Sequence, residues 1–403
     1  MKAIILAAGE GVRLHPFTIN QPKSMVEIAN KPILEYVINA LSHNGINEII
    51  LVIGFKKERI MDYFKDGIDF GVNITYVVQS QQLGTAHAIK QVRPHINDGF
   101  LVLNGDNLIE PETINDIISD KSNATIILTV MRENPKGYGV VIAKSGEVTK
   151  IVEKPETEIS KFLNTGIYRF QKEIFNEIEE LEISERGELE ITDAVQRMID
   201  KNYRVQTIST THKWMDVIYP WNLIDVNSEV LNKSIGNKEI GVSANIENNV
   251  TIRGIVSIGE NTIIRSGTYI IGPVKIGNNC DIAPNTVILP STTIGNNVTV
   301  GSFTEIKNSI IMHGARIGTL CVLSNSIIGE NVIIGSHNVY ESKKTNIIMR
   351  DTIHSIDVGA IIGENCIIES SVNINPGTIV GADCQIGSGN TIIKSMPNNS
   401  NVI

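Results

Sequence analysis

The chain has 403 residues, enough for two or three domains of the usual ~100–200 residues. Hydrophobic residues make up 42% and charged residues 20%, which excludes a disordered polymer. The net charge of −9 argues against a general binder of nucleic acids or anionic membranes. The apolar run at 3–8 is too short for a signal peptide, and no stretch reaches the ~18–20 apolar residues of a membrane-spanning helix. We expect a cytoplasmic protein that binds neither nucleic acid nor membrane.

The first half alternates short runs rich in Ile and Val with segments of helical apolar spacing. The pattern predicts strands at 3–8, 48–53, 74–78, 100–103 and 125–131, and helices at 32–41, 57–64, 86–92 and 112–119. Such alternation is typical of an α/β fold with a mostly parallel sheet. We expect helical stretches at 192–201 and 220–232 to connect this first domain, residues 1–232, to the second.

The second half, residues 242–395, repeats every six residues, as in Ile276-Gly-Asn-Asn-Cys-Asp and Ile282-Ala-Pro-Asn-Thr-Val. Each unit predicts one short strand and a turn, with the aliphatic residue inward and three units to a triangular coil. The resemblance to hexapeptide-repeat proteins implies a left-handed parallel β-helix. Residues 340–357 break the period and are expected to form a polar loop, either lining a ligand site or simply solvated.

Two further expectations concern side chains of the repeat. The four cysteines make no Cys-x-x-Cys pair, and each lies four residues after the Ile or Val that opens a unit, so all should be small buried residues: Cys280, Cys321, Cys366 and Cys384. In pairs such as Ile310-Ile311, Ile327-Ile328 and Ile333-Ile334, one isoleucine should face outward. Such apolar stripes predict assembly of several copies, a trimer or a dimer of trimers.

The first strand runs into a glycine-rich turn that suits phosphate binding. Gly9 and Gly11 lie in Leu6-Ala-Ala-Gly-Glu-Gly-Val-Arg-Leu14, where bare backbone N–H groups can approach an anion. Neither the P-loop nor the full dinucleotide fingerprint is present. Arg13 and Lys23 add two cations beside the turn, enough for a polyphosphate.

The run 6–14, with Pro16, Thr18, Pro22 and Lys23, resembles the signature of sugar-1-phosphate nucleotidylyltransferases. Six further motifs match that family in order: Gln79 with Leu83-Gly84-Thr85-Ala86, Asn104-Gly105-Asp106, Tyr138-Gly139-Val140, Glu153-Lys154-Pro155, Asn164-Thr165-Gly166 and Trp214-Met215-Asp216. The resemblance spans the N-terminal half, and some members also carry a β-helix. It is greatest to archaeal-type proteins similar to the bifunctional N-acetylglucosamine-1-phosphate uridylyltransferase and glucosamine-1-phosphate acetyltransferase.

The resemblance implies that a sugar 1-phosphate attacks the α-phosphorus of a nucleoside triphosphate and releases pyrophosphate, with catalysis by positioning and charge neutralisation. It implies a catalytic role for Arg13, Lys23 and Lys154. Nucleotide binding falls to Leu6, Ala7, Ala8, Gly9, Gly11, Gln79, Gly84, Thr85 and Asp106, with Gln79 at the base. Gly139, Glu153, Asn164 and Asp216 would meet the sugar phosphate. Asp106 and Asp216 would hold Mg²⁺, which favours a few carboxylates plus phosphate oxygens.

Several alternatives stay open. The nucleotide is UTP or dTTP, and the sugar is N-acetylglucosamine 1-phosphate or glucose 1-phosphate; a non-catalytic regulatory subunit is the alternative of another class. None of the histidines of the first domain is required by the chemistry, so packing or surface roles are expected for His15, His43, His87, His95 and His212.

The bifunctional relatives acetylate an amino sugar phosphate from acetyl-CoA with a His followed three positions later by Tyr, the His acting as base. The corresponding positions here, 319–322, read Thr-Leu-Cys-Val. His337 and Tyr340 have the right spacing about one coil later, either by coincidence or as a displaced base. We expect no efficient acetyl transfer.

Overall fold

The computed structural model describes residues 1–133, 135–233, 239–349 and 352–403. By its internal contacts the chain forms two compact units. The first, here called the sheet unit, comprises Met1–Gly11, Asn20–Val26 and Pro32–Asp216. The second, the coil unit, comprises Val12–Ile19, Glu27–Lys31 and Val217–Ile403. The domain limits expected from the repeat, 1–232 and 242–395, stay a prediction, since contacts group residues differently near the N-terminus and before residue 234.

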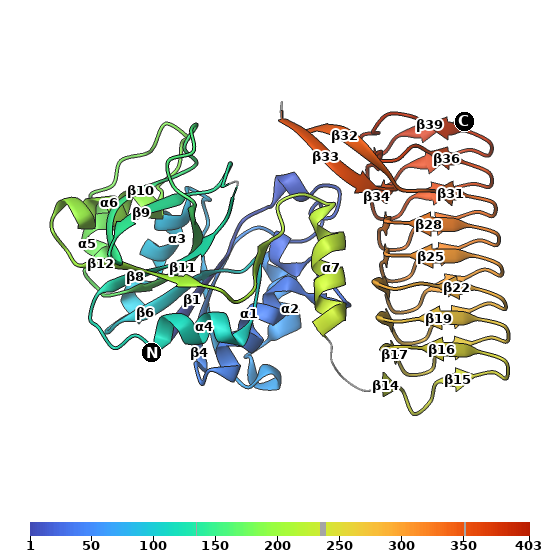
Figure 1. The fold of residues 1–403 in the computed structure, drawn as a ribbon, viewed down its shortest axis with the longest axis horizontal. Coiled ribbons are helices and arrows are strands. Elements are labelled where there is room, and N and C mark those ends of the chain that lie inside the picture. Colours follow the sequence, from blue (N-terminus) through green and yellow to red (C-terminus); the bar gives the residue numbers. More distant parts are fainter. Residues whose placement is uncertain (134, 234–238, 350–351) are drawn as a thin grey trace. The chain divides into compact units, whose positions relative to one another are not determined.

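A nine-stranded sheet in the order β5-β4-β1-β6-β11-β8-β12-β10-β9 forms the centre of the sheet unit (Figure 1). Its strands are β1 (Lys2–Ala7), β4 (Glu48–Ile53), β5 (Asn73–Val78), β6 (Phe100–Asn104), β8 (Thr125–Met131), β9 (Val140–Lys144), β10 (Glu147–Val152), β11 (Phe162–Phe170) and β12 (Val205–Thr210). Four neighbours, β5 to β6, are parallel, but β11 runs antiparallel to β6 and β8, and β9 antiparallel to β10. The expectation of a mostly parallel sheet is therefore correct for the first half, whereas in the second half only β8 and β12 are paired in parallel among the described strands. β9 and β10 join through a hairpin, which needs no crossover helix.

Helices cover both faces of this sheet, because alternate residues of each strand point to opposite sides. Ile5 and Leu51 share one core with α1 (Ile33–His43), α2 (Lys57–Phe64) and α4 (Pro111–Ile118). Ile4 and Val52 share the other core with α3 (Thr85–Gln91), α5 (Ile174–Glu179) and α6 (Ile191–Asp200). The expectation that residues 192–201 connect the two domains is wrong. They form α6, whose buried face belongs to this second core.

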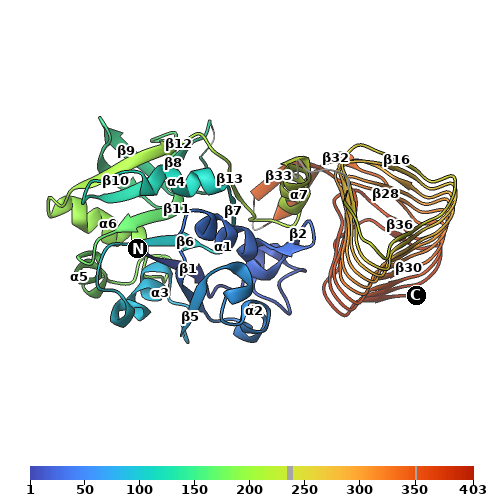
Figure 2. The same cartoon turned by 90° about the horizontal axis from the view of Figure 1, so that it is seen from below.

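Three all-parallel sheets of eight, nine and eight short strands build the coil unit (Figures 1 and 2). They run from β14 (Glu239–Ile240) to β37 (Ile379–Val380), from β15 (Asn245–Ile246) to β40 (Asn401–Val402), and from β16 (Thr251–Arg253) to β39 (Thr391–Ile392). Ile264 pairs with Ile282, so each coil takes three six-residue units. The inward Ile and Val residues form one continuous core. At corners such as Asn279 (φ 56°) and Asn297 (φ 58°) the backbone is left-handed, a conformation that Asn tolerates.

The cysteines behave as predicted, and the isoleucine pairs only in part. Cys280, Cys321, Cys366 and Cys384 are free thiols buried in the core of the coil. Ile333 is 40% exposed as expected. Ile310 and Ile327 also lie outside the inward core, but they are buried, so they form no exposed apolar stripe.

The reason is that other parts of the coil unit pack on the outer side of that sheet. Thr293, the register partner of Ile310, donates a hydrogen bond to Asn227 of α7 (Asn222–Lys233) at 2.7 Å. Asn30 donates to the carbonyl of Ile294 at 2.8 Å, and His313 lies 2.7 Å from the carboxylate of Glu27.

Residues 340–357 were expected to form a polar loop, which is wrong. They contain two antiparallel strands, β32 (Lys343–Met349) and β33 (Thr352–Val358). Alternating exposure along both strands explains the mixed polar composition that suggested a loop. His354 of β33 packs on the rings of Tyr219 and Trp221, with ring centroids 4.5 and 5.2 Å away. The insertion is therefore a packed hairpin; Arg350 and Asp351, which the sequence places in it, lie outside the described residues.

Candidate active site

The predicted phosphate-binding run lies at the carboxyl edge of the parallel half of the sheet. Gly105 donates to the carbonyl of Leu6 at 2.9 Å, and Gln79 donates to the carbonyl of Ile53 at 2.8 Å. The segments after β1, β4, β5 and β6 are thus neighbours, as expected where the carboxyl ends of parallel strands meet. Ligands of open α/β sheets bind at this edge, where Leu6 and Ala7 end β1 and Ala8 follows it.

One cation and two carboxylates come together at this edge. Nζ of Lys23 lies 2.5 Å from Oδ2 of Asp106 and 3.4 Å from Oδ1 of Asp216. Asp106 follows β6, while Asp216 ends β13 (Trp214–Asp216), which pairs with β7 (Asn107–Ile109). Burial disfavours the charged ammonium, but the two carboxylates outweigh this and raise the pKa of Lys23 above its usual range. The three side chains, far apart in sequence, therefore form a single electrostatic cluster.

The glycine-rich turn lies beside Lys23. Gly11 has a φ of 75°, and a Cβ added there would come within 2.6 Å of the Cβ of Lys23. Apart from its chain neighbours, no atom of the described residues would lie within 4 Å of a Cβ at Gly9. Gly11 is thus required by both backbone conformation and close approach, while Gly9 borders open space. Arg13 lies in the short helix η1 (Val12–Leu14), which groups with the coil unit.

The predicted base-binding residues form a second group at the same edge. Gln79 is only 5% exposed, and its Nε2 donates to the carbonyl of Gly84 at 3.2 Å. Thr85 accepts a hydrogen bond from the backbone of Ile191 at 3.0 Å, so its hydroxyl fastens α3 to the start of α6. Gln82, which our reading of the sequence missed, donates to the carbonyl of Ala8 at 2.7 Å and joins this group to the glycine-rich turn.

The residues expected at the sugar phosphate also converge. A Cβ at Gly139 would lie 2.9 Å from Oε2 of Glu153 and 3.5 Å from Nδ2 of Asn164. Nζ of Lys154 lies 3.3 Å from Oε1 of Glu153, and Lys154 has a left-handed backbone with φ 44°. Strained residues of this kind cluster at functional sites. The family resemblance implied this group, but not its support.

Two supporting residues were missed because only tertiary structure brings them to the group. Asn164 donates to the hydroxyl of Tyr168 at 2.5 Å. Arg186 lies 2.7 Å from Glu190 and 3.4 Å from Glu153. Burial, with the nearby charge of Glu153, raises the pKa of Glu190 above its ordinary value. The group therefore includes a third acidic side chain and a cation, Glu190 and Arg186, beyond the residues of its three motifs.

The two carboxylates suit a divalent cation. Asp106 and Asp216 already converge on one positive group and are only 27% and 18% exposed. Carboxylates in small number, completed by phosphate oxygens, are the ligands Mg²⁺ takes. Nowhere in the described ranges do three or more His, Cys, Asp or Glu side chains gather as a self-sufficient metal site. The pair therefore fits a metal that arrives with a phosphate ligand.

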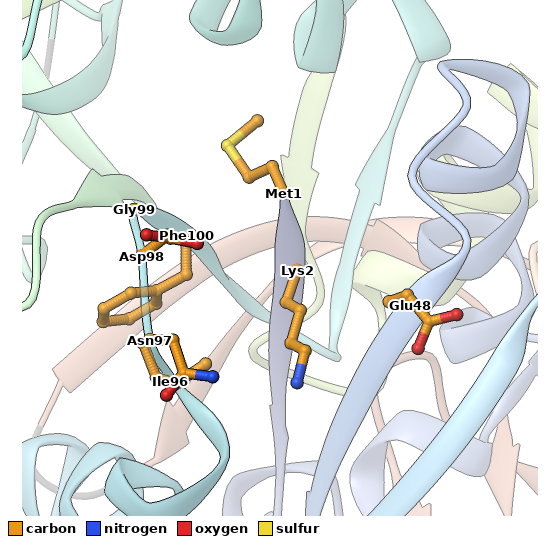
Figure 3. A pocket seen from close by; sticks show the side chains of 8 residues that line it. All are labelled: Met1, Lys2, Glu48, Ile96, Asn97, Asp98, Gly99 and Phe100. Carbon is orange, nitrogen blue, oxygen red and sulfur yellow. The ribbon is translucent and has the colours of Figure 1, made fainter.

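A cavity of about 280 Å³ lies at the opposite end of the parallel strands (Figure 3). It is lined by residues at the starts of β1, β4 and β6, among them Lys2, Glu48 and Phe100. None of the predicted site residues lines it. It is therefore separate from the candidate site.

The histidine–tyrosine pair considered for acetyl transfer does not form one site. His337 occupies an exposed corner of the coil with φ 62°, whereas Tyr340 is fully buried in the apolar core of the coil. The two side chains thus lie in different environments, one exposed and one buried. None of the helices in the described ranges has the length and apolar character needed to cross a bilayer.

Comparison with known proteins agrees with this geometry. Residues 2–233 match the nucleotidyl transferase family model, residues 270–358 the GMPPB C-terminal domain, and residues 359–394 six bacterial transferase hexapeptide repeats. The bifunctional protein GlmU of Methanococcus maripaludis strain C5 is 40% identical over 98% of this chain and 95% of its own. The bifunctional sugar-1-phosphate nucleotidylyltransferase/acetyltransferase of Sulfurisphaera tokodaii is 38% identical over 98% of both chains.

Solved structures resemble the N-terminal part. A putative glucose-1-phosphate thymidylyltransferase from Bacillus anthracis has a TM-score of 0.53 and 28% identity, covering 59% of this chain and 98% of its own. A UDP-glucose pyrophosphorylase, solved with UDP-glucose, has a TM-score of 0.53 and 26% identity, covering 58% and 98%. Given these matches and the site at the carboxyl edge of the sheet, the chain belongs to the nucleotidyl transferase family.

Proposed function

We propose that this protein transfers a uridylyl group from UTP, or a thymidylyl group from dTTP, to N-acetylglucosamine 1-phosphate and releases pyrophosphate. The observation that carries the proposal is the cluster of Lys23 with Asp106 and Asp216 beside the glycine-rich turn. It offers a cation and a pair of metal-binding carboxylates where an α/β sheet binds phosphates. The names of the full-length relatives support the reaction class. We place the reaction in the cytoplasm.

In this proposal no protein nucleophile takes part, since the sugar phosphate oxygen attacks the α-phosphorus directly. Backbone N–H groups at Gly9 and Gly11, with Arg13 and Lys23, hold the triphosphate. Lys23 stays charged throughout, because its raised pKa prevents loss of the proton near neutral pH. Asp106 and Asp216 would hold Mg²⁺, which when bound neutralises phosphate charge.

The acceptor is held by the second group. Lys154 contacts the sugar phosphate, while Glu153, Asn164 and the backbone at Gly139 orient the sugar. The 2.9 Å approach of Glu153 to a Cβ at Gly139 supports this assignment, since only glycine leaves space between these side chains. Glucose 1-phosphate is a second candidate acceptor, favoured by the likeness to a putative glucose-1-phosphate thymidylyltransferase and a UDP-glucose pyrophosphorylase.

Acetyl transfer by the coil is proposed to be inefficient in this chain. The relatives are named as bifunctional, but here Thr319 to Val322 replace the expected base and Tyr340 is buried away from His337. A hydroxyl such as that of Thr319 cannot accept a proton near neutral pH. We propose instead that the coil serves assembly, as a homotrimer or a dimer of trimers.

The test is pyrophosphate release from four nucleoside triphosphates against four sugar phosphates, with and without Mg²⁺. We expect turnover with UTP or dTTP and N-acetylglucosamine 1-phosphate, lost in Asp106→Asn. The matched control is Asp98→Asn, two residues before β6 begins, whereas Asp106 follows the end of that strand. No turnover with any pair would favour a regulatory subunit, and an unaffected Asp106→Asn enzyme would contradict the metal site.

A further inference from the structure

We propose that His87 fixes the orientation of the Gln79 amide and so makes the nucleotide site prefer uracil or thymine over cytosine. The inference rests on the proposed function, in which Gln79 meets the base. It assigns a positioning role to a histidine for which the sequence suggested only packing. The role depends on which end of the Gln79 amide the protein engages.

Two contacts define that end. Gln79 follows β5 and is nearly buried, and its Nε2 lies 3.2 Å from the carbonyl oxygen of Gly84 and 3.0 Å from Nδ1 of His87. A backbone carbonyl only accepts hydrogen bonds, so the nitrogen end of the amide must face Gly84. The same nitrogen faces His87. Both hydrogens of the amide are thus directed at protein groups.

This arrangement dictates the protonation of the His87 ring. Because Nε2 of Gln79 brings a hydrogen, Nδ1 of His87 must accept it, and the proton of the neutral ring then sits on its own Nε2. The amide of Gln91 lies 3.1 Å from that ring nitrogen. With the ring proton there, the Gln91 amide turns its oxygen toward the ring and accepts that proton, which gives up the longer contact of its nitrogen with the His87 carbonyl oxygen at 3.4 Å. Gln91, His87 and Gln79 then form a chain of three hydrogen-bonding side chains.

The chain leaves a single polar function of Gln79 for the base, the oxygen Oε1, which can only accept. N3 of uracil and thymine carries a hydrogen, whereas N3 of cytosine presents a lone pair. A buried acceptor facing that lone pair leaves both groups unpaired, which is costly away from water. Without His87 only the 3.2 Å bond to the Gly84 carbonyl holds the nitrogen end, so the amide can turn over at the cost of that one bond and offer its nitrogen, which would suit cytosine.

The experiment measures the affinities of UTP and CTP by calorimetric titration, together with pyrophosphate release, for the wild type and three variants. His87→Leu removes the acceptor, while His87→Asn keeps an acceptor, Oδ1, close to the position of Nδ1. His95→Leu, at an exposed position in η4 (Arg93–His95), is the control. Thermal melting establishes that each variant is folded. If His87→Leu does not fold, Gln91→Leu replaces it. Loss of the Gln91 partner lets the proton of the His87 ring move from Nε2 to Nδ1, where the ring no longer accepts a hydrogen bond from Gln79.

We expect the wild type and His95→Leu to bind UTP more tightly than CTP. His87→Leu should reduce that ratio about tenfold or more, the scale of discrimination lost when a hydrogen-bonding partner in a site is mismatched. His87→Asn should restore most of the ratio, which a role in packing alone would not do.

An unchanged ratio in His87→Leu, an equal loss in His87→Leu and His87→Asn, or a wild type that does not discriminate would each overturn the inference. Selective UTP binding without pyrophosphate release would instead contradict the proposed reaction and leave the role of His87 intact.

Discussion

Replacing Lys23 by methionine removes one positive charge but keeps most of the length and volume of the side chain. In the wild type, Nζ of Lys23 lies 2.5 Å from the carboxylate of Asp106 and 3.4 Å from that of Asp216. In the variant the two carboxylates are left without this cation. All three side chains are between 17% and 27% exposed, intermediate between surface pairs worth ~0–1 kcal/mol and buried pairs whose disruption costs ~3–5 kcal/mol. We therefore expect the free energy of unfolding to fall by about 1–3 kcal/mol.

The effect on turnover should be larger than the effect on stability. Loss of one preorganised positive group from a charged transition state costs roughly 10²–10³ in kcat. The loss should be equal for every nucleoside triphosphate, because Lys23 addresses phosphates and not the base. Chemical denaturation and steady-state pyrophosphate release measure the two effects separately.

Lys161→Met is the matched control, since Lys161 lies 2.6 Å from Glu133 but both side chains are well exposed. It should change stability by less than about 1 kcal/mol and leave kcat unchanged. A Lys23→Met enzyme with kcat within about threefold of wild type would refute the assigned role, given the ~10²-fold minimum expected.

The pH dependence follows from the direction of the Lys23 pKa. The folded-state pKa is raised above the unfolded value, so the stabilisation is fully present below the unfolded pKa, about 10.4. It is lost only as pH rises through the higher folded value. The stability difference between wild type and Lys23→Met should therefore be constant between about pH 6 and 9, and a difference that changes steeply there would contradict this assignment.

Four further outcomes are expected. EDTA should abolish turnover and Mg²⁺ restore it, while Asp106→Ala should raise the barrier by several kcal/mol, each ~1.4 kcal/mol being tenfold in rate. Asn227→Ala should lower the stability of the coil unit by about 2–3 kcal/mol in a denaturation assay, because it removes hydrogen bonds to Ala29, Ser291 and Thr293. Asn232→Ala, at an exposed position, should have little effect in the same assay. Light scattering should report an oligomer whose mass falls in Phe303→Asn, since Phe303 is an apolar side chain that is 60% exposed. Asn suits the position, because Phe303 has a φ of 60° and Asn occupies neighbouring corners of the same conformation. A wild-type monomer at micromolar concentration would contradict this. Acetyl-CoA with glucosamine 1-phosphate should release little free CoA, and robust release that His337→Ala abolishes would make His337 the base after all.

Local patterns were sufficient for the elements and the site motifs. The strands at 48–53 and 125–131 and the helix at 57–64 have the predicted bounds, because their apolar spacing agrees with their burial. The repeat likewise predicted the coil and its buried cysteines. The repeat could not predict which of its outward residues other segments bury. Ile310 reads as an outward residue, but it is buried on a sheet on which α7 and residues 27–31 also pack.

In the candidate site too, the sequence indicated the residue types, but not which of them contact one another. The sequence indicated an amide at position 79 and a histidine at position 87, eight residues apart across a strand end and a helix start. Their contact arises only when the chain between them turns through Gly84, at φ 104°, to bring the helix back beside the end of β5. An amide has a donor end and an acceptor end of nearly the same shape, so its identity alone leaves base recognition undecided. Gly84 and His87 together determine which end the protein engages, and thereby which end remains for the base.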